Sequence, residues 1–445
     1  MNVAEKQSEL KKWYQLNFQT FEQSLNGSKA SPLHSVRVKA FEAFVKNGFP
    51  TPRTSEDWKY TNLQPIVKND FELAAFLKSH QVSIEDVNKL ALAKLAGDRL
   101  VFLDGVFAPI LSEITNQKGL SVRSFSDLEK SSDKQHKDLL SEHLTKYVNL
   151  EEYGVAALNT GFVNDGALIE IEEGAEIEKP IQLLFISTVH SRPTVSYPRV
   201  LLVSRKDSKA TVIENYKGFG QNTYFTCAVT EAFLDESADI KHYKILEEGS
   251  EATHYGHMAV VQSAKSKFST SSFSYSGKLI RNEVTPILNG EEIECHLYGL
   301  SVLSEEQHVD NFTVIDHKKP NCHSNELYKG IYKDKSRGVF SGTIIVRPDA
   351  QKTDAIQSNQ AILLSEDAEV DARPQLKIWA DDVKCTHGAT VGQIDQDALF
   401  YLRARGISEV QAKHMLMQAF AIDIFQEIED DFLRESLENR FLELL

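Results

Sequence analysis

The chain has 445 residues, which is long enough for two or three structural regions. Of these residues, 41% are hydrophobic and 25% are charged, which is typical of a globular protein. Its 49 Lys and Arg residues against 64 Asp and Glu residues leave a formal net charge of −15. Such an acidic surface argues against non-specific binding to nucleic acid or to an anionic membrane. No segment approaches the run of about 18 apolar residues that a membrane-spanning helix needs.

The first 25 residues are rich in Lys, Glu, Gln and Ser and do not form a secretory signal. The four cysteines, Cys227, Cys295, Cys322 and Cys385, lie far apart, which is typical of reduced thiols rather than of a disulfide framework. We therefore expect a cytoplasmic protein. No CxxC pair is present, so we expect no cofactor or cluster stably bound by the isolated chain.

Residues 1–155 are predicted to form a mainly helical region. Between residues 10 and 25, apolar side chains recur on one face of an amphipathic helix. The Gly- and Pro-containing stretch 48–52 then breaks the chain, and residues 100–103 are a short strand candidate.

Residues 156–392 have a different pattern, in which short runs of Val, Ile, Leu and Thr alternate with polar turns. Strands are expected at 168–171, 181–186, 200–203, 343–346, 362–364 and 376–379. So long a series of strands without intervening helices excludes a doubly wound sheet.

A loose seven-residue repeat begins at Ile171, Leu234 and Leu364, and its pattern is apolar, any, Glu, small or turn-forming, Ala, acid, β-branched. A turn followed by a small inward residue and a new strand fits one corner of a stacked coil with a rung of roughly twenty residues. The repeat favours a parallel β-helix, with a β-sandwich as the alternative.

Residues 393–445 are predicted to be helical again. Asp395 and Ser408 are N-cap candidates, Ser408 with Gln411 forms a capping box, and Gly406 separates two helices. An apolar ladder follows at Leu416, Phe420, Ile424, Ile428 and Phe432. This ladder either packs on the rest of the chain or docks another subunit.

Several common catalytic and nucleotide-binding motifs are missing from the sequence. Gly277-Lys278 lacks the remaining residues of a P-loop, so the chain is not expected to hydrolyse ATP by that motif. No dinucleotide-binding glycine motif follows a strand, and neither a nucleophile elbow nor an H-E-x-x-H motif occurs.

The segment 380–392 contains the most unusual combination of side chains, Cys385 and His387. Two residues apart on a strand, they point to the same face. Thiolate and imidazole are donors suited to iron or sulfur species, and a protonated imidazole lowers the pKa of a neighbouring thiol. Two ligands are too few for a stable site, so further donors must come from a second chain. The alternative is a buried Cys385 and a hydrogen-bonded structural His387.

A second group, His308, Asp310 and His317, precedes Cys322-His323. Adjacent Cys and His residues face opposite sides of a strand, so this pair and Cys295-His296 are poor chelators. Cys227 lies in an apolar strand, where core packing is the better interpretation.

Motifs in the second half of the chain resemble the SufB/SufD family of iron–sulfur cluster assembly (SUF) proteins. The matching segments, in unbroken order, are 338–342, 350–355, 380–392 and 399–407. The resemblance extends over roughly residues 160–430. Residues 53–63, with Glu56, Trp58, Lys59 and Tyr60, add an N-terminal signature of the SufD branch.

This resemblance implies a mainly β fold, a right-handed parallel β-helix flanked by N-terminal and C-terminal helical regions. It also implies a heterodimer with a SufB-like paralogue and a SufC-like ATPase held by the C-terminal helices, with Leu416, Phe420 and Ile424 as docking residues. The family places the strand of Cys385 and His387 at the heterodimer junction, where the histidine is a functional position and iron or a cluster is bound transiently.

Two departures from the SufB branch favour the SufD branch: Gly388 after His387 where SufB-like chains have Glu, and Gln360-Ala361 where they have a scaffold cysteine. The sequence therefore predicts a non-enzymatic, SufD-like assembly subunit that aids iron delivery. The alternatives are a SufB-like primary scaffold, a homodimeric regulatory form and, in another class, a β-helix enzyme acting on carbohydrate or acyl groups.

Overall fold

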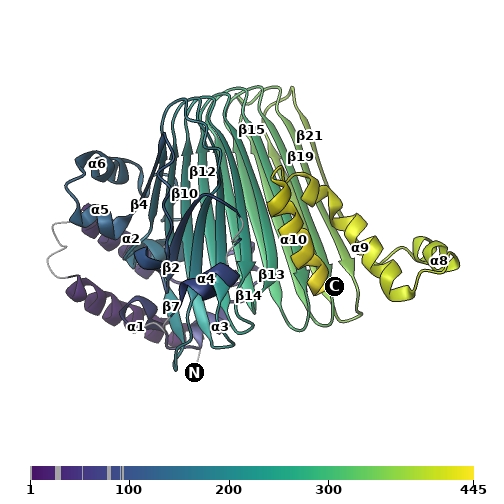
Figure 1. The fold of residues 1–445 in the computed structure, drawn as a ribbon, viewed down its shortest axis with the longest axis horizontal. Helices are drawn as coiled ribbons and strands as arrows, with labels where there is room; N and C mark the ends of the chain where they lie inside the picture. The colour runs from purple at the N-terminus through teal and green to yellow at the C-terminus, as the bar shows by residue number, and fades with distance from the viewer. Residues whose placement is uncertain (1–2, 26–31, 53, 78–81, 91, 93–94) are drawn as a thin grey trace.

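Two long β-sheets face each other along the molecule, with helices on their outer faces (Figure 1). The computed structural model describes residues 3–25, 32–52, 54–77, 82–90, 92 and 95–445. Successive strands alternate between the two sheets, and nearly all of them pair in parallel with the strand one turn earlier. The fold is therefore a mainly β, parallel β-helix with flanking helices, as the sequence predicts.

The two sheets contain 11 and 10 strands, and we call them sheet A and sheet B. Sheet A contains β1 (Glu72–Leu73), β4 (Leu120–Ser124), β5 (Ala167–Ile171), β7 (Thr194–Ser196), β8 (Arg199–Ser204), β10 (Tyr224–Leu234), β12 (Thr253–Gln262), β14 (Leu279–Leu288), β16 (His308–His317), β18 (Arg337–Val346) and β20 (Glu369–Ile378). Sheet B contains β2 (Asp98–Leu103), β3 (Val106–Phe107), β6 (Ile181–Ser187), β9 (Lys209–Gly218), β11 (Asp239–Glu247), β13 (Lys267–Ser276), β15 (Glu294–Leu303), β17 (His323–Tyr332), β19 (Asp354–Leu363) and β21 (Lys384–Gly392).

One turn of the β-helix takes between 26 residues, from Thr253 to Leu279, and 33 residues, from Ala167 to Val200. The expected rung of roughly twenty residues is wrong, because each turn contains two strands of typically 10 residues and two connecting turns. The inward small residue of the repeat is confirmed at Ala238, which is fully buried.

The turns from sheet A to sheet B stack on one another through the backbone. Six of them place a non-glycine residue at positive φ: Asp207, Ser237, Lys265, Glu292, Asn321 and Lys352. The N–H of Ser237, for example, donates to the carbonyl of Ala264 in the next turn at 3.0 Å. These bonds satisfy backbone groups that would otherwise be unpaired at each corner.

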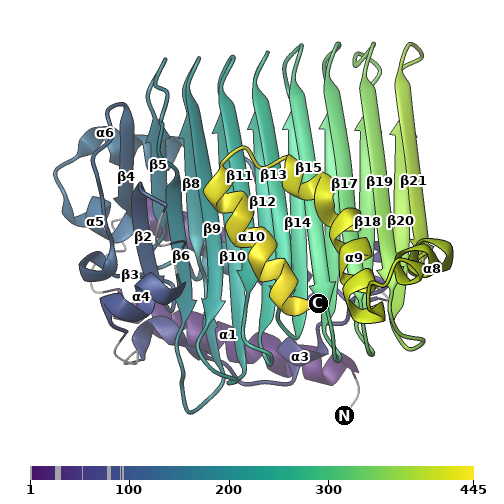
Figure 2. The ribbon, with the colours of Figure 1, turned by 45° about the vertical axis from the view of Figure 1, so that its right-hand side comes forward.

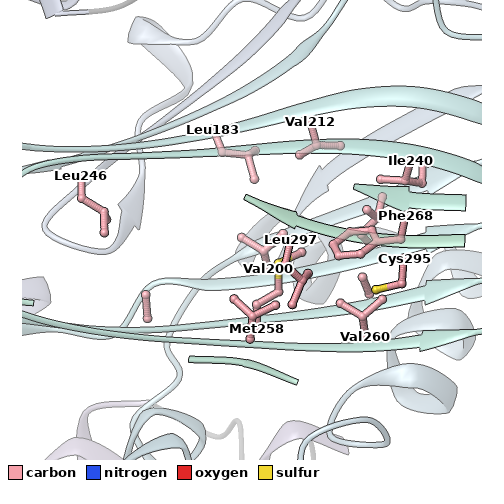
Figure 3. Packing of buried hydrophobic residues seen from close by; sticks show 14 of the residues in the cluster. Leu183, Val200, Val212, Ile240, Leu246, Met258, Val260, Phe268, Cys295 and Leu297 are labelled. Carbon is pink, nitrogen blue, oxygen red and sulfur yellow. The ribbon is translucent and has the colours of Figure 1, made fainter. Parts of the chain in front are cut away.

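The space between the two sheets, which we call the lumen, is filled by side chains. Figure 3 shows Ile240, Phe268 and Cys295 of sheet B packed against Met258 and Val260 of sheet A. This continuous apolar cluster runs from β2 to β19, so the lumen is a packed core and not a pore.

Most of the N-terminal helices cover the outer face of sheet A, whereas Val87 and Leu111 of this region pack on sheet B. Tyr14 and Phe21 of the first helix pack with Phe225 and Tyr255 of the sheet, which confirms the amphipathic face predicted there; the side chain of Leu10 and residue Arg53 lie outside the described residues. The helical elements of this region are α1 (Val3–Ser24), α2 (Pro32–Asn47), η2 (Glu56–Trp58), α3 (Gln64–Val67), η3 (Ala74–Phe76), α4 (Ile84–Leu90), η4 (Pro109–Leu111), α5 (Phe125–Lys130), α6 (Lys134–His143) and α7 (Gly154–Gly161).

The C-terminal helices α8 (Gln396–Ala404), α9 (Glu409–Gln426) and α10 (Asp431–Leu444) lie beside sheet B. Asp395 and Ser408 cap α8 and α9 with their side chains, as predicted. In Figure 2, α9 and α10 lie across sheet B, whereas α8 projects beyond it. Within the described ranges, no helix is long and apolar enough to cross a membrane.

Candidate functional site at the open end of the β-helix

The β-helix ends in two edge strands, β20 and β21, each of which pairs with a neighbour on one side only (Figure 2). We call this the open end. In β21, the N–H of Lys384 donates to the carbonyl of Thr353, the residue before β19, at 2.8 Å. Backbone direction alternates along a strand, so the N–H groups of Cys385, His387 and Ala389 point away from β19. This edge is free to pair with another strand.

The edge of sheet A differs because β20 contains Pro374. The N–H of Glu369 donates to the carbonyl of Ser336, the residue before β18, at 3.1 Å, so position 374 falls among the residues whose backbone nitrogen faces the free edge. Proline has no N–H to donate there, which interrupts any further strand pairing in the middle of β20. Only the edge of sheet B offers an uninterrupted strand.

Cys385 and His387 both face the lumen at this end, which confirms that they share one face of the strand. Cys385 is in register with Ala355 of β19, and His387 is in register with Gln357 of β19. These two β19 residues are in turn in register with buried residues of β17. The Cys385 side chain is half-buried beside Ala355, whereas His387 is exposed. Neither element packs a further side chain over the imidazole.

The thiol of Cys385 is not activated within this chain. Burial and the negative charge of Asp354 raise its pKa, against a smaller lowering by the backbone N–H of Ala355. This direction is opposite to the lowering expected from a neighbouring protonated imidazole. Cys385 is therefore a neutral thiol at pH 7, and a metal ion must displace its proton to bind.

Two polar residues that sequence analysis missed lie behind His387 in the lumen. Gln357 of β19 is buried, and its Nε2 donates to Oε2 of the fully buried Glu326 of β17 at 2.6 Å. Burial raises the pKa of Glu326 to about 7, although the bond from Gln357 favours its ionised form. Glu326 follows the same register as Gln357 and His387.

A glycine of the family motif makes room for this pair. A Cβ at Gly342 of β18 would lie 2.4 Å from Nε2 of Gln357 and 2.9 Å from Oγ1 of Thr313. Since both distances are shorter than a normal contact of a Cβ, any other residue at position 342 would force the Gln357 amide or its neighbours to shift, and Gly342 leaves the space that this amide occupies.

The second predicted cluster has a structural role. Asp310 is buried and bonded to Arg281 and to Thr61 of the N-terminal region, and the Arg281 guanidinium lies 4.4 Å from the Trp58 ring. His317 bonds to Ser324 at 2.9 Å in the core. These contacts fasten the segment after η2 to the outer face of sheet A.

The other three cysteines are buried, and burial raises the pKa of each thiol: Cys227, Cys295 and Cys322. Core packing at Cys227 is confirmed. In the part of the chain that the structure describes, no group of three or more His, Cys, Asp or Glu side chains is arranged to hold a metal ion. Cys385 and His387 thus supply at most two donors.

The apolar ladder of the C-terminal region packs on the chain's own sheet B. Ile424 is completely buried in the cluster that joins α9 to the sheet, and Leu416 and Phe420 are half-buried at its margin. Lys329 of β17 further ties down this helix by donating to the Phe420 carbonyl at 2.8 Å. The expectation that Ile424 contacts a partner directly is corrected by this burial.

The exposed apolar side chains of these helices lie elsewhere, on α8 and on the outward side of α9. Phe400 is 74% exposed, and α8 projects away from the β-helix (Figure 1). The set consists of Phe400, Tyr401, Val410, Met415 and Ile422. We call it the α8–α9 surface.

Comparison with known proteins identifies the family. A family model described as "SUF system FeS cluster assembly, SufBD core domain" matches residues 185–420, and a second, "SufBD protein N-terminal region", matches residues 8–183. The chain belongs to the SufBD family. Both the open end and most of the α8–α9 surface fall within the SufBD core domain.

Full-length SufBD relatives include several proteins named SufD. The chain is 31% identical to the iron–sulfur cluster assembly protein SufD of Escherichia coli, over 96% of this chain and 95% of the relative. It is 29% identical to an iron–sulfur cluster assembly SufBD family protein of Synechocystis, over 91% and 89%. It is 25% identical to SufD of Bacillus subtilis, over 91% and 92%. The chain is therefore SufD-like.

Proposed function

We propose that this chain is the SufD-like subunit of a SUF iron–sulfur cluster assembly complex, in which it acts as a scaffold and not as a free-standing enzyme. Its open end pairs with a SufB-like paralogue, and its C-terminal helices hold a SufC-like ATPase. Cys385 and His387 then contribute to a composite site at the junction, which receives iron or a nascent cluster as its substrate.

The observation that carries this proposal is the unpaired edge of β21 at the end of a long parallel β-helix. Natural proteins cover or block such edges, and sheet A is blocked by Pro374 whereas sheet B is not. The apolar side chains Ile378, Trp379 and Val391 are exposed at the same end. A paralogue of the same family is expected to end in edge strands of the same kind, which favours a paralogue as the occupant.

The chemistry of the junction also favours a shared site. A neutral, half-buried thiol and an exposed imidazole give two donors, and iron needs about four in a cluster or tetrahedral site. The partner must supply the rest. When ferrous iron binds Cys385, an Fe–S bond forms and the S–H bond breaks, so one proton leaves the site.

Support for the ATPase partner comes from the α8–α9 surface. Five large side chains there are between 46% and 74% exposed, and the sequence has no P-loop of its own. A docked ATPase both buries these side chains and supplies ATP hydrolysis. A change in the arrangement of the docked ATPase can then open or close the junction with the SufB-like partner.

The decisive experiment blocks the free edge of β21 without touching the donors. Ala389→Pro removes an N–H that makes no bond within the sheet, so the β-helix should stay folded. Ala389→Val is the matched control, since it keeps the N–H and suits a strand. Each variant is co-expressed with the SufB-like and SufC-like proteins, and the complexes are separated by size exclusion.

We expect Ala389→Pro to lose the SufB-like partner while retaining the SufC-like ATPase, and Ala389→Val to retain both. A complete complex with Ala389→Pro at unchanged affinity contradicts the proposal. Homodimers of the isolated chain that are lost in the same variant point to the homodimeric form as the occupant of this edge instead.

A further inference from the structure

Glu326, Gln357 and His387 form one column of lumen-facing residues on three successive strands of sheet B. Register pairs Glu326 of β17 with Gln357 of β19, and Gln357 with His387 of β21. Adjacent strands lie about 4.8 Å apart, so each side chain in the column is within reach of the next. The inner two residues are buried and the outermost is exposed at the open end.

The Gln357 amide is oriented by its inner neighbour. Its Nε2 donates to Oε2 of Glu326 at 2.6 Å, which directs its carbonyl oxygen Oε1 elsewhere. This Oε1 is buried and has no hydrogen-bond partner within the described chain. Buried acceptors almost always find a donor, so an unpartnered one marks a position where a donor arrives.

His387 is the donor that the register supplies. His387 is the residue next to Gln357 in the column, and its imidazole forms no hydrogen bond to any other described residue. A neutral imidazole carries one N–H, and whichever ring nitrogen donates to Gln357 leaves the other with a free lone pair. Metal-binding histidines are commonly held by such a second bond.

We propose that Glu326 and Gln357 are positioning residues that hold His387 in one tautomer, with its N–H donated to Oε1 of Gln357 and its lone pair directed to the junction. The inference rests on the proposed function, in which His387 is a donor at that junction. Glu326 is essential to this arrangement, because an amide can turn either its oxygen or its nitrogen toward His387. The carboxylate of Glu326 accepts the hydrogen bond from the amide nitrogen, so the amide oxygen is the atom that faces His387.

The arrangement also accounts for the space at Gly342. The amide of Gln357 reaches Glu326 only because β18 has no side chain at that point. Thr313 lies across the same gap, and its hydroxyl, like the Gln357 amide, acts on Glu326 to lower the pKa of that carboxyl. The residues that surround the Gln357 amide in the lumen therefore leave it the space that it needs to reach Glu326.

Nitrogen NMR of histidine side chains tests the proposal on the full chain at pH 8. Protonated and unprotonated ring nitrogens have well separated shifts, so the tautomer of His387 is read directly, with His387→Asn used for assignment. Gln357→Leu removes the acceptor, and Glu326→Gln removes the carboxylate at constant volume. Ser358→Ala, on the outer side of β19, is the matched control.

We expect one tautomer to dominate in the unmodified chain and in Ser358→Ala. Losing a hydrogen bond of ordinary strength should shift the tautomer ratio by roughly fivefold in Gln357→Leu and in Glu326→Gln. An unchanged ratio in both variants overturns the proposal, even if His387 proves necessary for cluster assembly. A shifted ratio alongside a fully active His387→Ala protein leaves the positioning intact and contradicts the proposed function.

Discussion

At the scale of single residues, His387 and Cys385 differ in how many packing contacts their side chains make, and so in how much each contributes to folding stability. His387 is exposed, and the one side-chain hydrogen bond proposed for it is the bond to Gln357, whereas Cys385 packs beside Ala355. Removing the imidazole therefore costs little folding energy, but the donor nitrogen has no substitute.

We predict that His387→Ala lowers cluster assembly in cells while its free energy of unfolding falls by no more than about 1 kcal/mol, the contribution of one hydrogen bond. Cys385→Ser should have the smaller effect on assembly, because serine keeps the size and some hydrogen bonding. Complementation in cells, melting temperature and pull-down with the SufB-like protein check this on the same variants. Full activity of His387→Ala returns this residue to a structural role.

Glu326 gives a prediction about pH that needs no partner protein. Its pKa is raised from 4.5 to about 7 by burial, so folding is favoured when the carboxyl is protonated. That contribution is complete below pH 4.5 and is lost as the pH rises through about 7. The difference corresponds to roughly 3 kcal/mol of unfolding free energy.

Glu326→Gln, which mimics the protonated acid, should therefore be more stable than the unmodified chain at pH 8 by up to that amount and nearly equal to it at pH 4.5. Urea unfolding at the two pH values measures the difference. The exposed Glu306→Gln is the control and should show no such change. Equal stabilities of Glu326→Gln and the unmodified chain at pH 8 contradict a strained carboxylate in the lumen.

Sequence reasoning could place Cys385 and His387 on one face because that inference needs only the two-residue period of a strand. It could not find Glu326 or Gln357. Each lies in an unremarkable stretch, and their relation to His387 depends on the register between strands 30 or more residues apart. Nothing local in the chain encodes that register.

At the scale of elements, the C-terminal helices were predicted with their caps, but the direction of their apolar ladder was not. A stripe of Leu, Phe and Ile looks the same whether the chain's own sheet or another subunit covers it. The cover here is sheet B, with Tyr275 and Phe273 beneath the helices. We therefore propose the side chains that this packing leaves exposed as the docking surface.

We predict that Phe400→Glu abolishes binding of the SufC-like ATPase without changing the fold, because the side chain is 74% exposed on a projecting helix. Ile110→Glu is the matched control: this residue is 92% exposed but lies in the N-terminal region. Pull-down with the ATPase and circular dichroism separate the outcomes. Unchanged ATPase affinity for Phe400→Glu excludes the α8–α9 surface as the docking site.

At the scale of the whole molecule, the strand pattern and the repeat favoured a parallel β-helix over a β-sandwich, and the family resemblance implied the β-helix, but the rung length predicted from the repeat was wrong. Three short sequence matches cannot show whether the turns that contain them all lead from sheet A to sheet B or whether one leads from sheet B to sheet A. The copies at Leu234 and Leu364 follow β10 of sheet A and β19 of sheet B, so they lie at opposite corners. Their spacing is for this reason not a whole number of turns.

The whole molecule also determines what the chain can hold by itself. Its donors at the open end are one neutral thiol and one imidazole, its other thiols are buried in the core, and no group of three metal-binding side chains occurs in the described part. The sequence has no P-loop. Every missing component is one that the proposed partners provide.

We therefore predict that the isolated chain binds neither ATP nor a stable iron–sulfur cluster, whereas the complex with both partners binds both. Two protein donors leave an iron ion or cluster open to water and exchange, so it should be lost on gel filtration. Anaerobic reconstitution with iron and sulfide, followed by absorption spectra and iron counting, measures this, with Cys385→Ser His387→Ala as the control for adventitious iron. A stoichiometric cluster that stays on the isolated chain through gel filtration, and is lost in the double variant, shows that the open end is a complete site without a partner.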